Sequence, residues 1–264
     1  MKKLLYKIAL TSIVAVLILT SVVAAESLTA SSNTAYVLPQ KRVEVGLFQP
    51  LRYGYTDNVE FSMHPLLFFV MPNFDVTWAH GQRGEFAIAS RHGVTYPTPL
   101  LRLIAKEGIG GMISPEFDIP HIFSFQNELL ATAPVFDNHL FTAKIGVNFA
   151  LLTKDLDSRT TIDLPVIYTR TSVYYNDFGI NLGTDMQGPL FKRFDYLVDA
   201  DIFYHPTAEA DVNFALEHKG LITWKKSARF QLCFGYLLSY GKYPFGEQWH
   251  LLPLFDLSWA WNRN

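Results

Sequence analysis

The stretch "HLFTAKIGVNFALL", residues 139–152, alternates between two kinds of side chain almost from end to end. Its odd positions from Phe141 to Leu151 are apolar, whereas Lys144 and Asn148 stand at even positions. Successive side chains of a β-strand point to opposite faces of a sheet. The stretch therefore predicts a long strand with one apolar face and one polar face.

The same period of two continues through the chain from Arg42 onward, in runs that are separated by turn residues. No helical period is sustained in these runs. The pattern of residues 97–120 fits either a short helix or the end of a long strand. An even number of runs, about twelve, is typical of single-chain outer-membrane barrels. The runs are residues 43–55, 59–69, 74–80, 85–97, 121–133, 139–152, 163–175, 178–188, 194–205, 211–224, 229–243 and 248–261.

The apolar faces of these runs indicate contact with lipid rather than with a protein core. The opposite faces are rich in Gly, Asn, Asp, Gln and Ser, as in a wet lumen, and the runs are long enough to cross a bilayer at a tilt. Tyr and Trp favour the headgroup zone of a membrane, and they end many apolar faces: Tyr53, Tyr55, Trp78, Tyr96, Tyr174, Tyr175, Tyr204, Trp224, Tyr236, Tyr240, Trp249, Trp259 and Trp261. We expect an all-β fold, a closed antiparallel transmembrane β-barrel with an up-and-down meander. The alternative is a secreted β-sandwich or barrel with a dry core.

The first 25 residues have the features of a secretory signal peptide. Lysines at positions 2, 3 and 7 precede an apolar run that closes on Val23-Ala24-Ala25. We expect cleavage there and location in the outer membrane, with an uncleaved anchor as the alternative. Residues 26–41 are small and polar and predict a flexible lead-in, and residues 42–264 form the barrel.

Composition excludes several classes of function. The net charge of −2 gives no reason to expect a nucleic-acid partner. The single cysteine, Cys233, cannot form an internal disulfide. The histidines are dispersed without metal-ligand spacing, and Asp155, Asp157 and Asp163 lack the spacing of a calcium loop. We expect neither a metal nor a cofactor.

The chain resembles Gram-negative outer-membrane β-barrels, since "YGYTDNVEF", residues 53–61, is similar to a Tyr-Gly-x-Thr-Asp-x-x-Glu hairpin of small barrels. The resemblance implies a lipid bilayer as partner and assembly by the barrel-insertion machinery. Such barrels usually end on an aromatic residue, whereas here Trp261 is followed by Asn262-Arg263-Asn264.

The polar positions of the runs predict the residues that line the lumen. They are Glu44, Arg52, Glu60, His64, Asp75, Arg91, Lys144, Asn148, Asn181, Asp185, Asp199, Asp201, Glu217, Lys219, His250 and Asp256. Such charges either line a narrow path for small polar solutes or ions, or pair across the lumen and plug it. A narrow porin-like channel and a structural barrel both remain open.

An alternative function is enzymatic. Strict alternation places Ser90 and His92 on the apolar face of residues 85–97, and Asn127 on the apolar face of the following run. Polar residues on a lipid-facing stripe are costly and need a reason. The set resembles outer-membrane phospholipase A and implies nucleophile, base and orienting roles in lipid hydrolysis. The motif of that family is His-x-Ser followed by Asn-Gly, whereas this chain has Ser-Arg-His-Gly at residues 90–93.

Two rules give opposite predictions for the orientation of the barrel in the membrane. The longest connections, near residues 106–120 and 153–162, fall at one end, and longer loops are usually extracellular. With a periplasmic N-terminus, however, the run count places that end inside.

Overall fold

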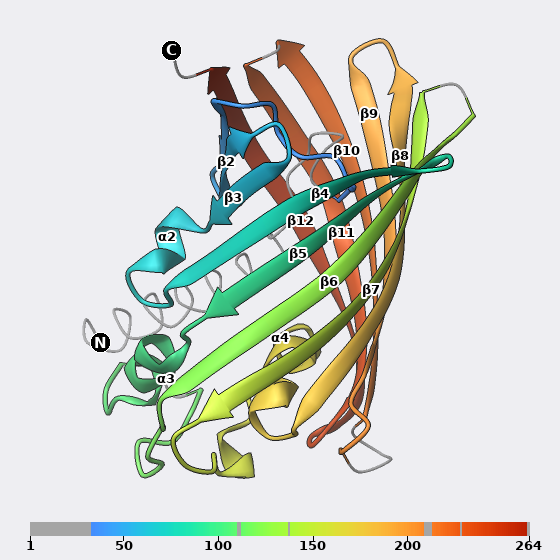
Figure 1. The fold of residues 1–264 in the computed structure, drawn as a ribbon. Coiled ribbons are helices and arrows are strands. Elements are labelled where there is room, and N and C mark those ends of the chain that lie inside the picture. The colour runs from blue at the N-terminus through green and yellow to red at the C-terminus, as the bar shows by residue number, and fades with distance from the viewer. Residues whose placement is uncertain (1–32, 110–111, 137, 209–212, 228, 263–264) are drawn as a thin grey trace.

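Twelve antiparallel strands close into a barrel in the computed structural model, which describes residues 33–109, 112–136, 138–208, 213–227 and 229–262. Each strand pairs with its neighbours in sequence, and β1 pairs with β12 to complete the ring (Figure 1). The strands are β1 (Arg42–Gly46), β2 (Leu51–Thr56), β3 (Val59–Met63), β4 (Asn73–Arg83), β5 (Phe86–Thr95), β6 (Ile122–Val135), β7 (His139–Leu152), β8 (Phe178–Phe191), β9 (Phe194–Tyr204), β10 (Phe214–Ser227), β11 (Phe230–Tyr243) and β12 (Gly246–Asn262). The predicted all-β, up-and-down barrel is confirmed.

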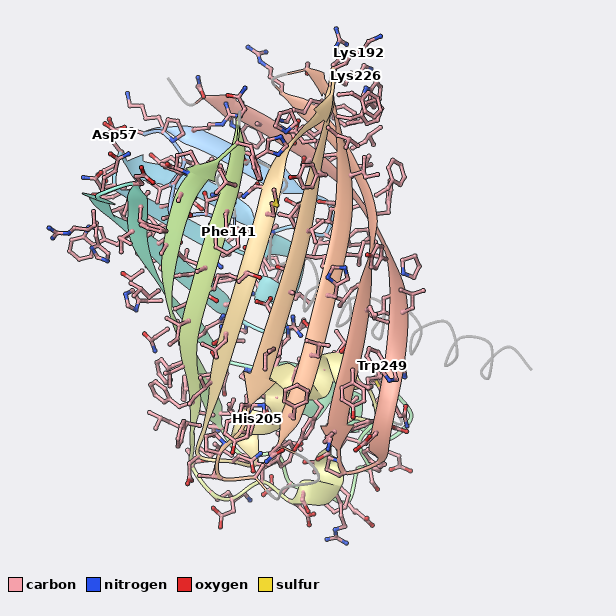
Figure 2. The ribbon with its side chains drawn as sticks, turned by 90° about the vertical axis from the view of Figure 1, so that its right-hand side faces the viewer. Asp57, Phe141, Lys192, His205, Lys226 and Trp249 are labelled. Carbon is pink, nitrogen blue, oxygen red and sulfur yellow. The ribbon has the colours of Figure 1, made fainter. Side chains whose placement is uncertain are left out.

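Strand β7 shows how alternation builds the wall. Thr142, Lys144 and Gly146 are buried on the inner face, whereas Phe141 and Ile145 point outward and are exposed. Figure 2 shows Phe141 on the outer side of the barrel. Because adjacent strands place paired residues on the same face, this inner and outer division extends around the ring.

The prediction of one strand over residues 43–55 is wrong, because the stretch forms β1 and β2. Four residues, 47–50, connect the two strands, and Glu44 pairs with Arg52 across the turn. Paired residues lie on the same face of the sheet. Glu44 and Arg52 are eight positions apart, an even separation, so that the period of two continues unbroken through the turn. The pattern alone therefore gave no sign of the break.

The predicted strand over residues 163–175 is also wrong. Pro165 begins helix α4 (Pro165–Thr171), and the 3₁₀ helix η2 (Ser172–Tyr174) follows. Proline suits the first position of a helix, where its missing N–H is not needed. Tyr174 consequently lies in a buried apolar cluster and not at a lipid-facing end. The two errors cancel, which is why the predicted count of twelve strands agrees with the structure.

Prolines also decide the other departures from the predicted runs. Strand β3 ends at Met63, not at residue 69, because Pro65 starts helix α2 (Pro65–Phe68). In the stretch left open over residues 97–120, helix α3 (Thr98–Ala105) forms, with a proline in its first turn. Among the described residues, no helix is long and apolar enough to cross a bilayer.

The two ends of the barrel differ. Short turns after β2, β4, β8 and β10 lie at the end where β1 begins and β12 finishes. The long connections, with α2, α3 and α4, lie at the opposite end (Figure 1). Figure 2 shows Asp57, Lys192 and Lys226 at the short-turn end and His205 near the other. Because residues 43–55 contribute two strands, the long connections lie opposite the N-terminus of the barrel, and the orientation conflict disappears.

The interior is filled from both ends. Instead of forming a free lead-in, residues 33–41 enter the short-turn end, where Ala35 N donates to Thr132 Oγ1 at 2.8 Å and Leu38 N donates to Glu60 Oε2 at 2.8 Å. At the other end, α3, α4 and their loops share an apolar cluster around Ile104 and Val166. The predicted signal peptide, residues 1–25, lies outside the described residues.

Candidate functional site

One buried polar group of the lumen is centred on Lys144. Its Nζ lies 3.0 Å from Asp185 Oδ1, 3.1 Å from Asp199 Oδ2 and 2.9 Å from Asp201 Oδ1. Lys219 Nζ lies 3.4 Å from the same oxygen of Asp199. These side chains come from β7, β8, β9 and β10, so that their attraction joins four neighbouring strands.

Two further groups of ion pairs lie on the inner faces of β2, β3, β5 and β6. Arg52 binds both oxygens of Glu60, at 2.5 and 2.6 Å, and approaches Glu44 at 3.5 Å. Arg91 lies 3.2 Å from Glu128 Oε2, and the other oxygen of Glu128 accepts from Asn181 Nδ2 at 3.0 Å. Glu128 is a lumen residue that the sequence prediction missed, although it stands at a polar position of residues 121–133.

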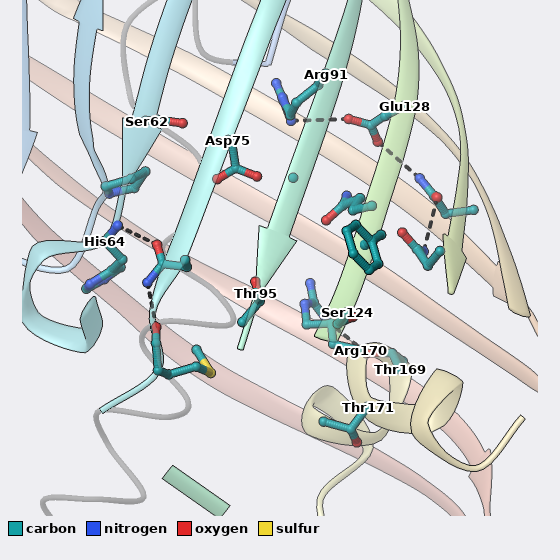
Figure 3. A pocket seen from close by; sticks show the side chains of 18 of the residues that line it. Ser62, His64, Asp75, Arg91, Thr95, Ser124, Glu128, Thr169, Arg170 and Thr171 are labelled. Atoms are coloured by element: carbon teal, nitrogen blue, oxygen red, sulfur yellow. Dashed lines mark hydrogen bonds and ion pairs between the residues drawn. The ribbon is translucent and has the colours of Figure 1, made fainter. Parts of the chain in front are cut away.

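A cavity of about 300 Å³ remains between these groups. Figure 3 shows Asp75, Arg91 and Glu128 on its strand side and Thr169, Arg170 and Thr171 of α4 below them. Of the sixteen residues predicted to line the lumen, the following lie on the cavity wall: Arg52, Glu60, His64, Asp75, Arg91, Lys144, Asn148, Asn181, Asp199, Asp201, Glu217 and Lys219. Glu44, Asp185, Asp256 and the half-buried His250 lie on inner faces away from it.

The long-loop end of the cavity is closed by α4. Arg170 holds Glu217 with two short bonds, at 2.5 and 2.6 Å, and Ser172 Oγ lies 2.6 Å from His205 Nε2. Burial lowers the pKa of His205 to about 4, so that the ring is neutral at pH 7. Arg170 was not predicted, because its stretch was assigned to a strand.

The outer face carries a second polar set, and it consists of the three residues predicted for the enzymatic alternative. His92 Nδ1 lies 2.8 Å from Asn127 Oδ1, and His92 Nε2 lies 3.0 Å from Ser90 Oγ. His92 and Asn127 are directly paired residues of β5 and β6, and Ser90 is two residues from His92 on the same face. From the sequence, a hairpin that turned near residues 108–109 would place Asn127 roughly opposite Ser90. In the structure Asn127 instead pairs with His92, two residues further along β5, which places the amide beside the base.

The hydrogen bonds fix the roles of the ring nitrogens. An amide oxygen only accepts, so that His92 Nδ1 must carry the proton that it donates to Asn127. In the neutral ring, the other nitrogen, Nε2, carries no proton and accepts the hydroxyl proton of Ser90. A serine that donates to an oriented neutral imidazole has the arrangement of an activated nucleophile and its general base.

The surroundings of this set are apolar and exposed. Trp78 of β4 pairs with Ser90, Leu129 of β6 pairs with it on the other side, and Val147 pairs with Asn127. The Trp78 side chain is 55% exposed. His92 stands three residues before the end of β5 at the long-loop side. The set therefore lies on the outer wall, below the rim that carries the long loops.

A fourth polar residue, His80, also reaches Ser90. His80 Nε2 lies 2.8 Å from Ser90 Oγ. Its signal in the sequence is weak, because it is only a histidine two residues beyond Trp78 in the run over residues 74–80.

The structure offers no alternative metal centre among the residues it describes. Asp157, one of the acidic residues considered for calcium, instead forms side-chain bonds with Arg159 at 2.6 and 3.0 Å. This guanidinium holds the pKa of Asp157 down at about 2.

No family model matches the sequence, and no curated protein matches it. Solved structures resemble the barrel, and three of them are described next. The outer membrane channel DcaP of Acinetobacter baumannii is 10% identical, with 91% of this chain and 67% of that chain covered and a TM-score of 0.41. A bacterial polysaccharide outer membrane secretin is 7% identical, with 84% and 70% covered and a TM-score of 0.45. OpdK of Pseudomonas aeruginosa, solved with vanillate, is 10% identical, with 84% and 57% covered and a TM-score of 0.41. At this level, likeness indicates neither common descent nor a shared activity.

Proposed function

We propose that the chain is an outer-membrane β-barrel that hydrolyses an ester bond of a membrane lipid. Membrane location is supported by the outer face, where large apolar side chains are exposed on most of the strands, among them Ile145, Leu182, Phe234 and Leu251. Strands β6, β7, β8, β10 and β11 have 14 residues each, more than the 9–11 or so that a tilted strand needs to cross a bilayer. Export by a cleaved signal peptide over residues 1–25 belongs to the same proposal.

The observation that carries the hydrolase proposal is the Ser90–His92–Asn127 hydrogen-bond chain on an apolar outer face. Ser90 Oγ attacks the ester carbonyl carbon while its proton passes to His92 Nε2, and Asn127 keeps the imidazole in the required tautomer. The bond to the leaving alcohol breaks, and the alcohol takes the proton from His92. Water then attacks the acyl-serine, with His92 again as the base, and releases the fatty acid.

The position of the set favours a lipid as substrate. A soluble ester would have to enter the hydrocarbon layer to reach Ser90, whereas a lipid in the outer leaflet already places its ester groups near the headgroup boundary. The long-loop end is extracellular under the usual rule of longer outer loops. His92 lies three residues below that end of β5, a depth of roughly 7 Å for a strand tilted near 45°.

The test is hydrolysis by protein purified in detergent, with p-nitrophenyl palmitate in mixed micelles and phosphatidylglycerol vesicles as substrates. Wild type should release fatty acid, and Ser90→Ala should lose all of this activity. The control is Ser227→Ala, an exposed serine at the opposite end of the barrel, which should keep it. Equal rates for wild type and Ser90→Ala would refute the proposal.

A second candidate function is a narrow path for small polar solutes or ions, favoured by the charged cavity between the two filled ends. The plug of α4 and the entry of residues 33–41 stand against free passage. Planar-bilayer recordings decide the matter, because a path gives discrete conductance steps and a plugged barrel gives none.

A further inference from the structure

We propose that His80 is a second catalytic histidine, which donates its Nε2–H to Ser90 at rest and to the oxyanion formed when Ser90 attacks. This inference rests on the proposed hydrolase function and adds the group that stabilises charge.

The direction of the bond between His80 and Ser90 follows from the one proton that a hydroxyl can donate. Ser90 gives that proton to His92 Nε2, because His92 Nδ1 is already committed to Asn127. The contact between His80 Nε2 and Ser90 Oγ, at 2.8 Å, can then be a hydrogen bond only if His80 is the donor. His80 and His92 are thus opposite tautomers. His80 donates a hydrogen bond to Ser90 Oγ, and His92 accepts one from it.

A β-bulge brings His80 to this position. Trp78 pairs with Ser90 and Ala79 with Ala89, but the next paired residue is Gly81, which faces Ile88. In a regular ladder His80 would face Ile88, and its Cβ would be roughly 7–8 Å from that of Ser90 along the diagonal. The extra residue shifts His80 toward Ser90, as bulges beside active sites commonly do. Gly81 has φ +88°, a conformation that side chains rarely adopt, so glycine maintains the bulge.

The neighbourhood increases the effect of such a donor. The indole of Trp78 lies beside the His80 ring, with 5.6 Å between ring centroids, and Trp78 and Leu129 flank Ser90 on the two neighbouring strands. When Ser90 Oγ bonds to the carbonyl carbon, negative charge moves to the carbonyl oxygen, one bond further away. An N–H already aimed at Oγ needs only a small rotation to reach that oxygen, and in an apolar layer its electrostatic value is larger than in water.

Two variants of His80 separate a catalytic role from a structural one. His80→Phe keeps the aromatic volume and removes the donor, whereas His80→Gln keeps an N–H at about the same reach. With p-nitrophenyl palmitate in mixed micelles, kcat of His80→Phe should fall about 10²- to 10³-fold, with KM nearly unchanged. His80→Gln should recover at least about tenfold of that loss.

The outcomes distinguish the two proposals. If His80→Phe keeps the wild-type kcat while Ser90→Ala is inactive, the role of His80 is refuted and the hydrolase stands. If Ser90→Ala equals wild type, both proposals fail. A measurement without turnover checks the donor directly: ¹⁵N spectra of histidine-labelled protein should show His80 protonated at Nε2, with a shift of that signal in Ser90→Ala. Protonation of His80 at Nδ1 would overturn the inference.

Discussion

Removal of Lys144 should destabilise the barrel more than removal of any surface lysine. Lys144 and Lys219 face Asp185, Asp199 and Asp201, so that two positive and three negative charges sum to −1 when all are ionised. Lys144→Met takes the sum to −2 and leaves Asp185 and Asp199 buried beside each other without their closest cation. Breaking a buried ion pair by removing one partner costs about 3–5 kcal/mol. The expected loss of unfolding free energy is therefore about 3–5 kcal/mol.

The assay is equilibrium urea unfolding of the protein in lipid vesicles, followed by tryptophan fluorescence and by gel mobility. Lys225→Met is the matched control, because Lys225 pairs with Asp195 in a more exposed position near the short-turn end and such pairs contribute at most about 1 kcal/mol. The triple variant Lys144→Met, Asp185→Asn, Asp199→Asn should regain part of the loss. A Lys144→Met protein as stable as the Lys225→Met protein would show that the aspartates are not held as charges by Lys144.

Three more perturbations have defined outcomes. Asn127→Leu should lower kcat about 10²-fold, since the His92 ring loses its orientation, whereas Asn127→Asp keeps an acceptor; equal rates for the two variants would exclude an orienting role. Burial lowers the pKa of His205 from 6.5 to about 4. Between these two pH values the imidazole binds a proton in the unfolded loop but not in the folded loop. Its stability should be complete above pH 6.5 and decline toward pH 4 by up to about 3 kcal/mol, visible as faster hydrogen exchange of α4, and His205→Gln should abolish this dependence. Gly54→Val should expel residues 33–41, because a Cβ there would lie 2.1 Å from the Pro39 carbonyl oxygen; trypsin should then cleave after Lys41, and continued resistance would contradict the packing.

The barrel could be predicted from sequence because apolar and polar residues alternate along its strands, and this alternation is visible in each short stretch of sequence. A polar residue that faces lipid or an apolar residue that faces the lumen is costly. The alternation in residues 139–152 therefore identifies both faces of β7. What alternation cannot report is where one strand ends and the next begins. Residues 47–50 preserve the period through a turn, and residues 163–175 imitate it although Pro165 starts a helix.

The candidate site divides in the same way. Ser90 and His92 were predictable as a pair, because two polar residues interrupt an apolar stripe at a spacing of two. Their contact with Asn127 depends on the register between β5 and β6, which the long connection over residues 96–121 leaves undetermined. His80 depends on a bulge, and a bulge changes the pairing without changing the pattern of residue types.

The shortness of β1, β2 and β3 has a mechanical consequence. These strands have five, six and five residues. Strand β1 pairs with β12 only over Arg42–Gly46, whereas β6 and β7 pair over 14 residues. Local opening begins where the fewest backbone bonds must break. We therefore expect this patch of the wall to open first when the barrel fluctuates, ahead of the wall built by the long strands.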